Sequence, residues 1–144
     1  LLEVLDFYKQ QNIPFDQAVC IYPCAPFIKA DLLTEAAEVL QKHKADVVFP
    51  VIRYGHPIQR ALKLDANGKI SAFFDGYAQS RTQDLEVAFH DAGMFYFFEV
   101  TRFEQTKSLR TENTIAIEID ENHAQDIDSE SDWQLAELKY QNQK

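Results

Sequence analysis

Apolar and polar positions alternate along the chain in a way that predicts helices and strands in turn. Residues 1–8 carry apolar side chains at helical spacing. Residues 18–22 form a short apolar run that ends at a proline, which is typical of a buried parallel strand. A broad apolar stripe predicts a helix over residues 31–43, and residues 46–51 predict the next strand. The expected apolar face of the first helix consists of Leu1, Val4, Leu5 and Tyr8.

The middle of the chain has a different pattern. Residues 58–64 and 69–74 flank an Asp-Ala-Asn-Gly sequence, and Asn-Gly between two extended segments is a strong signal for a β-hairpin. We therefore expect a β-rich excursion from the main sheet over residues 54–89.

The second half returns to the first pattern. It predicts an apolar strand over residues 94–98, a helix over 99–108, an alternating strand over 114–119 and a final helix that begins after Ser129. The residues expected to face inward are Val100, Phe103, Ile115, Ile117, Ile119, Trp133, Ala136 and Tyr140.

A strand, helix and strand in succession predict a crossover connection. Such crossovers are right-handed and build parallel sheets, so we expect residues 1–144 to form one α/β domain. The expected architecture is a three-layer α/β/α sandwich with a mostly parallel, Rossmann-like sheet.

Composition narrows the possible functions. The chain has 144 residues, 46% of them hydrophobic, which is enough for a substantial core. The formal net charge of −9 argues against a nucleic acid or an acidic membrane as partner. Cys20 and Cys24 have no second cysteine pair, so a zinc site or disulfide framework is not expected. Without a signal-peptide pattern or a membrane-length apolar run, a cytoplasmic location is expected.

Asp126 and Asp128 are the strongest candidates for chemistry. In an extended segment, residues two apart point the same way, so both carboxylates would share one spot while Ile127 points into the protein. Two acids held this close repel each other, and either a shared proton or a hard cation such as Mg2+ relieves the repulsion. The alternative is that both acids are simply solvated before a helix that Ser129 and Asp132 open as a capping box.

Other candidates are more scattered. The proline-containing loop of residues 22–27 follows a strand, where α/β proteins gather ligands. Two guanidiniums and an amide, on Arg60, Arg81 and Gln83, could fix a carboxylate and hydroxyls, although lone surface arginines are common. Residues 90–93, His-Asp-Ala-Gly, would allow a ligand to approach the backbone closely.

Five segments taken together resemble the acylneuraminate cytidylyltransferase family. They occur in the family's order through nearly the whole chain, with compatible spacing. The segments are Tyr-Pro-Cys-Ala-Pro-Phe at 22–27, Pro-Ile-Gln-Arg-Ala-Leu at 57–62, Ser-Arg-Thr-Gln-Asp-Leu at 80–85, His-Asp-Ala-Gly at 90–93 and Gln-Asp-Ile-Asp at 125–128.

The resemblance implies a nucleotide-diphospho-sugar transferase-like fold and a Mg2+-dependent transfer of CMP from CTP to a nine-carbon 2-keto sugar acid, with Mn2+ as a possible substitute. It also implies a homodimer formed through the excursion. The carried-over roles are metal binding for Asp126 and Asp128, with Asp128 also catalytic, and sugar-acid binding for Tyr22, Gln59 or Arg60, Arg81, Gln83 and Asp91.

Some alternatives stay open from sequence. The segments at 57–62 and 80–85 favour pseudaminic acid over sialic, legionaminic or 3-deoxy-octulosonic acid as the sugar. Family members begin with a phosphate-binding loop, and nothing of that kind precedes Leu1. We therefore expect the N-terminal nucleotide-binding part to be absent and this chain alone to be inactive. A non-catalytic dimerisation or sugar-acid-binding module is the other hypothesis.

Overall fold

A computed structural model of the chain describes residues 1–143 and divides it into two compact units. The sheet unit comprises residues 1–52 and 91–143, and the hairpin unit comprises Arg53–His90. None of the helices in the described residues has the length and apolar content needed to cross a membrane.

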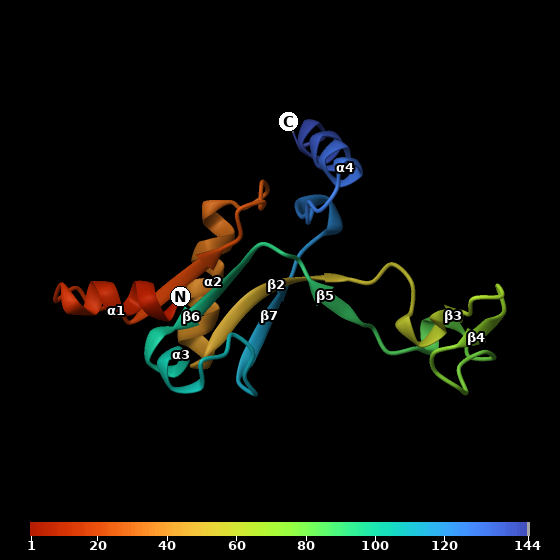
Figure 1. Cartoon of the computed structure of the whole chain (residues 1–144), viewed down its shortest axis with the longest axis horizontal. Helices are drawn as coiled ribbons and strands as arrows, with labels where there is room; N and C mark the ends of the chain where they lie inside the picture. Colours follow the sequence, from red (N-terminus) through yellow and green to blue (C-terminus); the bar gives the residue numbers. More distant parts are fainter. Residues whose placement is uncertain (144) are drawn as a thin grey trace. The chain divides into compact units, whose positions relative to one another are not determined.

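The main sheet is mixed. Strand β6 (Phe95–Glu99) lies between β1 (Gln17–Ile21) and β2 (Val47–Arg53) and is antiparallel to both. Strand β7 (Thr114–Glu118) pairs with β2 in parallel, and β5 (Phe89–Asp91) also pairs with β2 (Figure 1).

The predicted mostly parallel, Rossmann-like sheet is therefore wrong. Strands β1 and β2 do run in the same direction, as the crossover pattern predicted, but β6 separates them and is antiparallel to each. The apolar period of a strand shows which side chains are buried and carries no information on strand direction. The prediction of one parallel sheet therefore went beyond the sequence pattern.

One core lies on the face of the sheet that α2 (Ala30–His43) and α4 (Glu130–Gln141) cover. Its buried residues include Ala36 and Leu40 from α2, Ala136 from α4, and Val48, Phe95 and Ile117 from the strands. The sheet contributes every second residue of each strand to this core, because neighbouring side chains point to opposite faces.

A second core lies on the opposite face, with α1 (Leu2–Gln10) and α3 (Val100–Thr106). Val47 and Phe98 belong to it, whereas their neighbours Val48 and Phe97 pack in the first core. Helices on both faces give the sheet unit the predicted three layers (Figure 1).

Most inward-facing residues agree with the sequence pattern. Val100 and Phe103 are buried in the second core, as predicted for α3. The three isoleucines of β7 and its end also agree, because Ile115, Ile117 and Ile119 all pack in the first core.

The faces of the two terminal helices were partly mispredicted. In α1, Leu2 and Leu5 pack against the second core, while Leu1, Val4 and Tyr8 are exposed. In α4, Ala136 is buried as predicted, but Trp133 and Tyr140 are 53% and 54% exposed. Large apolar residues at helical spacing fit a buried and an exposed face equally well when the helix is apolar on several sides.

The hairpin unit contains the predicted β-hairpin. Strands β3 (Leu62–Leu64) and β4 (Ile70–Ala72) pair antiparallel, and 3-10 turns η1 (Ile58–Arg60) and η2 (Thr82–Asp84) flank them in sequence. The connecting turn uses Gly68 at a φ of +79°, which favours glycine. None of residues 53–90 is fully buried, so this unit has no core of its own.

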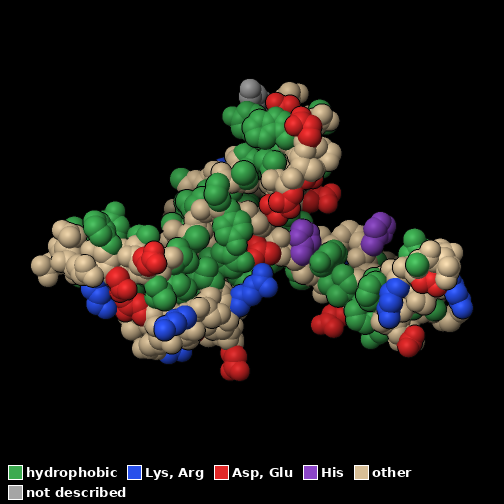
Figure 2. Space-filling model, viewed as in Figure 1, with side chains coloured by type: hydrophobic (Ala, Val, Ile, Leu, Met, Phe, Trp, Pro, Cys, Tyr) green, Lys and Arg blue, Asp and Glu red, His purple; other side chains and the backbone are tan. Residues whose placement is uncertain are grey.

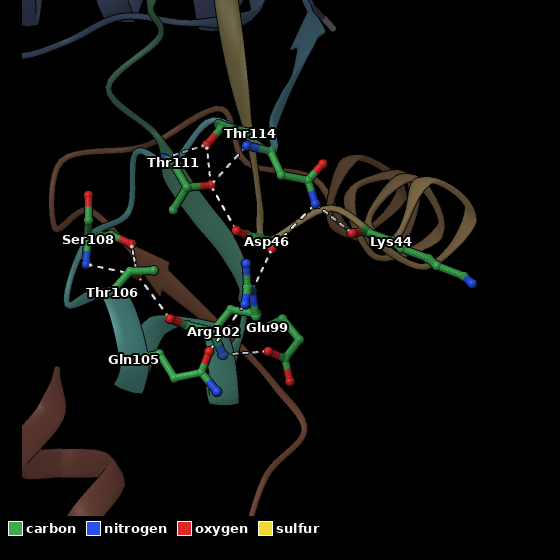
Figure 3. A network of polar contacts seen from close by, with 10 residues as sticks. Lys44, Asp46, Glu99, Arg102, Gln105, Thr106, Ser108, Thr111 and Thr114 are labelled. Atoms are coloured by element: carbon green, nitrogen blue, oxygen red, sulfur yellow. Dashed lines mark hydrogen bonds and ion pairs between the residues drawn. The ribbon is translucent and has the colours of Figure 1, made fainter.

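Asp46 is the one buried charged residue among those described, and it ties the sheet unit together (Figure 3). Its carboxylate accepts hydrogen bonds from Arg102 Nε at 3.1 Å, Thr111 Oγ1 at 3.0 Å and Asn113 Nδ2 at 3.3 Å. Burial raises the pKa of Asp46, but these hydrogen bonds and the Arg102 charge outweigh it and leave the pKa below its usual value.

We expect Asp46→Ala to lower the free energy of unfolding by about 2 kcal/mol, because Thr111 and Asn113 lose a charged acceptor. The contribution of Asp46 should be fully present above its unfolded-state pKa of about 3.9 and should be lost as the pH falls through its lower folded-state pKa. Urea unfolding at pH 7 and at pH 3 measures both effects.

The matched control is Lys9→Ala, which removes an exposed ion pair with Glu104 in the same unit. We expect it to change stability by less than about 0.5 kcal/mol. Equal losses for the two variants would contradict the structural role of Asp46.

Candidate functional site

The predicted site residues of the sheet unit meet at one edge of the sheet. Strands β1, β2 and β7 run in the same direction, so their carboxyl ends share this edge with the amino end of the antiparallel β6. Tyr22 follows β1, Gly93 precedes β6, and the segment with Asp126 follows β7. Ligands of open α/β sheets gather outside the carboxyl ends of strands.

Gly93 is the point where two of the predicted motifs touch. It has a φ of +67°, a conformation that residues with a side chain rarely adopt. A Cβ at this position would lie 3.1 Å from Cγ of Asp126 and 3.3 Å from its Oδ1. The missing side chain of Gly93 therefore leaves the space that the Asp126 carboxylate occupies, rather than space for a ligand.

The segment that carries the acid pair is fixed at both ends. Before it, Lys139 Nζ from α4 donates to the carbonyl oxygens of Glu121 and Ala124 at 2.7 and 2.8 Å, next to turn η3 (Glu121–His123). Burial lowers the pKa of Lys139. After it, Ser129 and Asp132 form the predicted capping box at the start of α4. The capping box, which the sequence offered as the alternative explanation of these acids, is therefore present next to the acid pair.

Asp126 and Asp128 are both exposed, while Ile127 between them packs against the first core, as the alternation predicted. Within residues 1–143, neither carboxylate has a hydrogen bond or an ion pair. Two acids with no cationic partner are a donor set suited to a hard cation.

No cluster of three or more His, Cys, Asp or Glu side chains that could hold a metal occurs in the described part of the chain. This result is compatible with Mg2+, which keeps several water ligands and is commonly bound by one or two carboxylates together with substrate phosphates. The residues present fit such an ion.

Asp91, another predicted site residue, is at the centre of a polar cluster. Its Oδ1 accepts a hydrogen bond from Gly93 N at 2.9 Å, and its Oδ2 accepts from the Tyr96 hydroxyl and from Arg110 Nη2 at 3.2 Å. The ring of Tyr22 lies 5.9 Å from that of Tyr96. Tyr22 and Asp91 are therefore linked through Tyr96.

Sequence reasoning missed Tyr96 and Arg110. Tyr96 is buried, and burial together with its hydrogen bond to Asp91 raises its pKa to about 12, so it is a hydroxyl donor at neutral pH. In the sequence, Tyr96 fits the apolar pattern of a core strand. The Arg110 side chain is 71% exposed. It has no motif around it, and only the fold brings it to Asp91, which is 19 positions away in sequence.

The other predicted residues belong to the hairpin unit. Gln59 Nε2 donates to the Glu86 carbonyl oxygen at 3.0 Å, and Arg60 Nη2 donates to the carbonyl oxygen of Ser80. Arg81 Nε pairs with Asp84 Oδ2 at 2.9 Å, with both side chains largely exposed, and Gln83 is exposed. The ring of His90 lies beside that of Tyr54, with the two planes tilted by 55° and the centroids 4.9 Å apart.

Of Gln59 and Arg60, which the sequence could not separate, Gln59 is the more buried. Its Oε1 is inaccessible to solvent and has no hydrogen-bond partner among the described residues. A bound molecule could donate to this acceptor only if neighbouring side chains moved to expose it.

A hollow of about 560 Å3 lies at the opposite edge of the sheet, next to Asp46, Arg102 and Asn113. These polar groups already bond to one another. The hollow is at the amino end of β2, away from the edge that carries Tyr22 and Asp126.

The chain is similar to cytidylyltransferases that act on a sugar acid. No protein-family model matches it. Two curated relatives, both named pseudaminic acid cytidylyltransferase and both from Campylobacter jejuni, are 29% identical over 136 residues, which is 94% of this chain. The resemblance found in the sequence is thereby confirmed for pseudaminic acid cytidylyltransferase in particular.

A third relative is the Helicobacter pylori protein named pseudaminic acid cytidylyltransferase and UDP-2,4-diacetamido-2,4,6-trideoxy-beta-L-altropyranose hydrolase. It is 30% identical over 129 residues, which cover 88% of this chain and 25% of that protein. The chain spans 59% of the length of the two Campylobacter relatives.

We expect Gly93→Ala to lower the free energy of unfolding by at least about 2 kcal/mol. About 1 kcal/mol comes from the positive φ, and the rest comes from pushing the Asp126 side chain aside. Gly68→Ala separates the two terms, because Gly68 also has a positive φ but a Cβ added there would meet no atom within 4 Å. Denaturant unfolding measures both variants, and an equal loss would mean that Asp126 does not pack on Gly93.

Proposed function

We propose that the protein transfers CMP from CTP to the anomeric hydroxyl of pseudaminic acid, a nine-carbon 2-keto sugar acid, and releases pyrophosphate. The hydroxyl oxygen forms a bond to the α-phosphorus of CTP, the bond from that phosphorus to pyrophosphate breaks, and the hydroxyl proton passes to water. Since the chain spans 59% of the relatives named for this activity, the activity of the whole protein is part of the proposal.

The observation that carries the proposal is the pair of exposed carboxylates without a cationic partner, on the sheet edge where Tyr22 and Asp91 also lie. Asp126 and Asp128 would hold Mg2+, or Mn2+ in its place. Such an ion neutralises charge on the phosphates and lowers the pKa of a hydroxyl bound to it.

The residues of this chain would orient that ion rather than react covalently. Gly93 fixes the position of Asp126, and the capping box of Ser129 and Asp132 fixes the backbone that follows Asp128. A site held by rigid elements on both sides loses little entropy when the ion and the triphosphate bind.

For sugar-acid binding, we propose two sets of residues, each within its own unit: Tyr22 and Asp91 in the sheet unit, and Gln59, Arg60, Arg81 and Gln83 in the hairpin unit. Gln59 Nε2 donates to the Glu86 carbonyl oxygen, which fixes the orientation of the Gln59 amide. Arg81 would bring a guanidinium for an anionic sugar, since its exposed pairing with Asp84 is weak.

The test is an activity screen of the protein, as its gene encodes it, with CTP against a panel of nonulosonic acids. We expect CMP-sugar and pyrophosphate to form with pseudaminic acid faster than with sialic, legionaminic or 3-deoxy-octulosonic acid. Absence of pyrophosphate release with every acid would reject the proposal.

For the metal, we expect Asp128→Asn to weaken Mn2+ binding in the presence of CTP by at least about tenfold, because a neutral amide is a poorer ligand than a carboxylate. Electron paramagnetic resonance of free Mn2+ measures the affinity. Glu137→Gln removes the same charge from the exposed face of α4 and should leave the affinity unchanged. The assignment of Asp128 fails if both variants bind Mn2+ as tightly as the wild type.

We also propose that the protein is a homodimer formed through the hairpin unit. Leu62, Leu64, Ile70 and Phe73 in this unit are 56–71% exposed, and apolar side chains show at its surface in Figure 2. A lone two-stranded hairpin is marginally stable in water, so burial against a second subunit would stabilise it.

Leu64→Lys should shift the protein toward monomer, since it puts a charge into the proposed interface while altering a side chain that is 71% exposed in the single chain. Light scattering after size exclusion measures the mass. Leu138→Lys on α4 is the control, because Leu138 is also exposed, at 58%, and lies in the other unit. A monomeric wild type, or equal effects of both variants, would contradict this interface.

A further inference from the structure

We infer that Arg110 binds the carboxylate of the sugar acid, and that Asp91 and Tyr96 are positioning residues that hold its guanidinium in place. This inference rests on the proposed function. It adds to the sugar site a cation that the sequence motifs do not include.

The guanidinium is held on one side only. Its Nη2 donates to Asp91 Oδ2 at 3.2 Å and lies 3.5 Å from the Tyr96 hydroxyl oxygen, and its Cζ is 6.0 Å from the centre of the Phe49 ring. Within the described chain, its Nε and Nη1 have no acceptor, and 71% of the side chain is exposed. Arg110 is therefore oriented by fixed partners and still has donors to offer a ligand.

Arg110 is linked to Asp126 of the acid pair through a chain of contacts. Asp91 accepts from Arg110 with one oxygen and from Gly93 N with the other, and Gly93 is the residue over which the Asp126 carboxylate packs. Two direct contacts thus separate Arg110 from Gly93.

The small net charge of the Arg110–Asp91 ion pair favours a carboxylate over the triphosphate as its ligand. Asp91 already neutralises Arg110, so the pair offers a fork of hydrogen-bond donors with little net charge. A planar carboxylate with one negative charge suits this fork. The triphosphate of CTP has a higher charge, and a divalent cation at Asp126 and Asp128 matches it better. The ring of Tyr22, which is 41% exposed and lies next to Tyr96, suits the carbon skeleton of a sugar.

The exposure of Arg110 separates this role from a structural one. The Arg110 side chain is largely exposed, and without it Asp91 keeps its hydrogen bonds from Gly93 N and the Tyr96 hydroxyl, so removing Arg110 should leave the fold intact. Arg110→Ala should therefore melt at nearly the temperature of the wild type, while a loss of substrate binding would come from the ligand alone.

Steady-state kinetics of the protein as encoded tests the inference. Arg110→Ala should raise the KM for pseudaminic acid at least about tenfold and change the KM for CTP less than about twofold, because only one substrate loses its charge-assisted hydrogen bonds. Arg110→Lys should recover only part of the loss, since an ammonium lacks the bidentate fork. Lys42→Ala, which removes an exposed cation from α2, should change neither KM.

A direct binding measurement keeps the inference separate from the proposed function. In calorimetric titration, the wild type should bind the sugar acid more tightly than its carboxamide analogue, and Arg110→Ala should bind both equally weakly. If Arg110→Ala keeps the wild-type preference for the acid, or raises both KM values equally, Arg110 does not bind the carboxylate. If the wild type forms no CMP-sugar with any acid, the proposed function fails, whatever the titration shows for Arg110.

Discussion

Strand β6 is the element on which the rest of the sheet unit depends. It pairs with β1 on one side and with β2 on the other, and its alternating side chains enter both cores, with Phe95 on one face and Phe98 on the other. Because a buried aromatic side chain is among the largest single contributions to a core, this strand links the two helical layers. Its direction, antiparallel to its neighbours, also determines what lies at each edge of the sheet.

The antiparallel direction of β6 matters for the site. Its amino end, with Asp91 and Gly93, comes to the edge where β1 and β7 have their carboxyl ends. In an all-parallel sheet this segment would lie at the opposite edge. The contact between Gly93 and Asp126, and the cluster of Asp91, Tyr96 and Arg110, therefore both follow from the same reversal. The edge carries an acid pair without a cation, and an arginine without a full set of acceptors reaches Asp91 there; these suit the two differently charged substrates of the proposed cytidylyl transfer.

Sequence patterns correctly predicted the features that depend on residues close together in the chain. The strict alternation of Ile115, Ile117 and Ile119 identified the buried face of β7, and Ser129 with Asp132 identified the start of α4. Asn67 and Gly68 identified the hairpin turn. Features that depend on distant partners were not predictable in this way. The direction of β6, the exposure of Trp133 and the contact of Arg110 with Asp91 are set by the packing of elements far apart in the sequence. The spacing of apolar residues within a segment carries no information on any of these three features.

The central claim is that the two carboxylates at this edge bind the divalent cation that accompanies CTP. The most direct measurement is the anomalous scattering of Mn2+ in crystals of the protein grown with CTP and manganese chloride. We expect one strong peak within coordination distance of both Asp126 and Asp128, in contact with the triphosphate. A manganese peak bound elsewhere, with both carboxylates left facing solvent beside bound CTP, would contradict it.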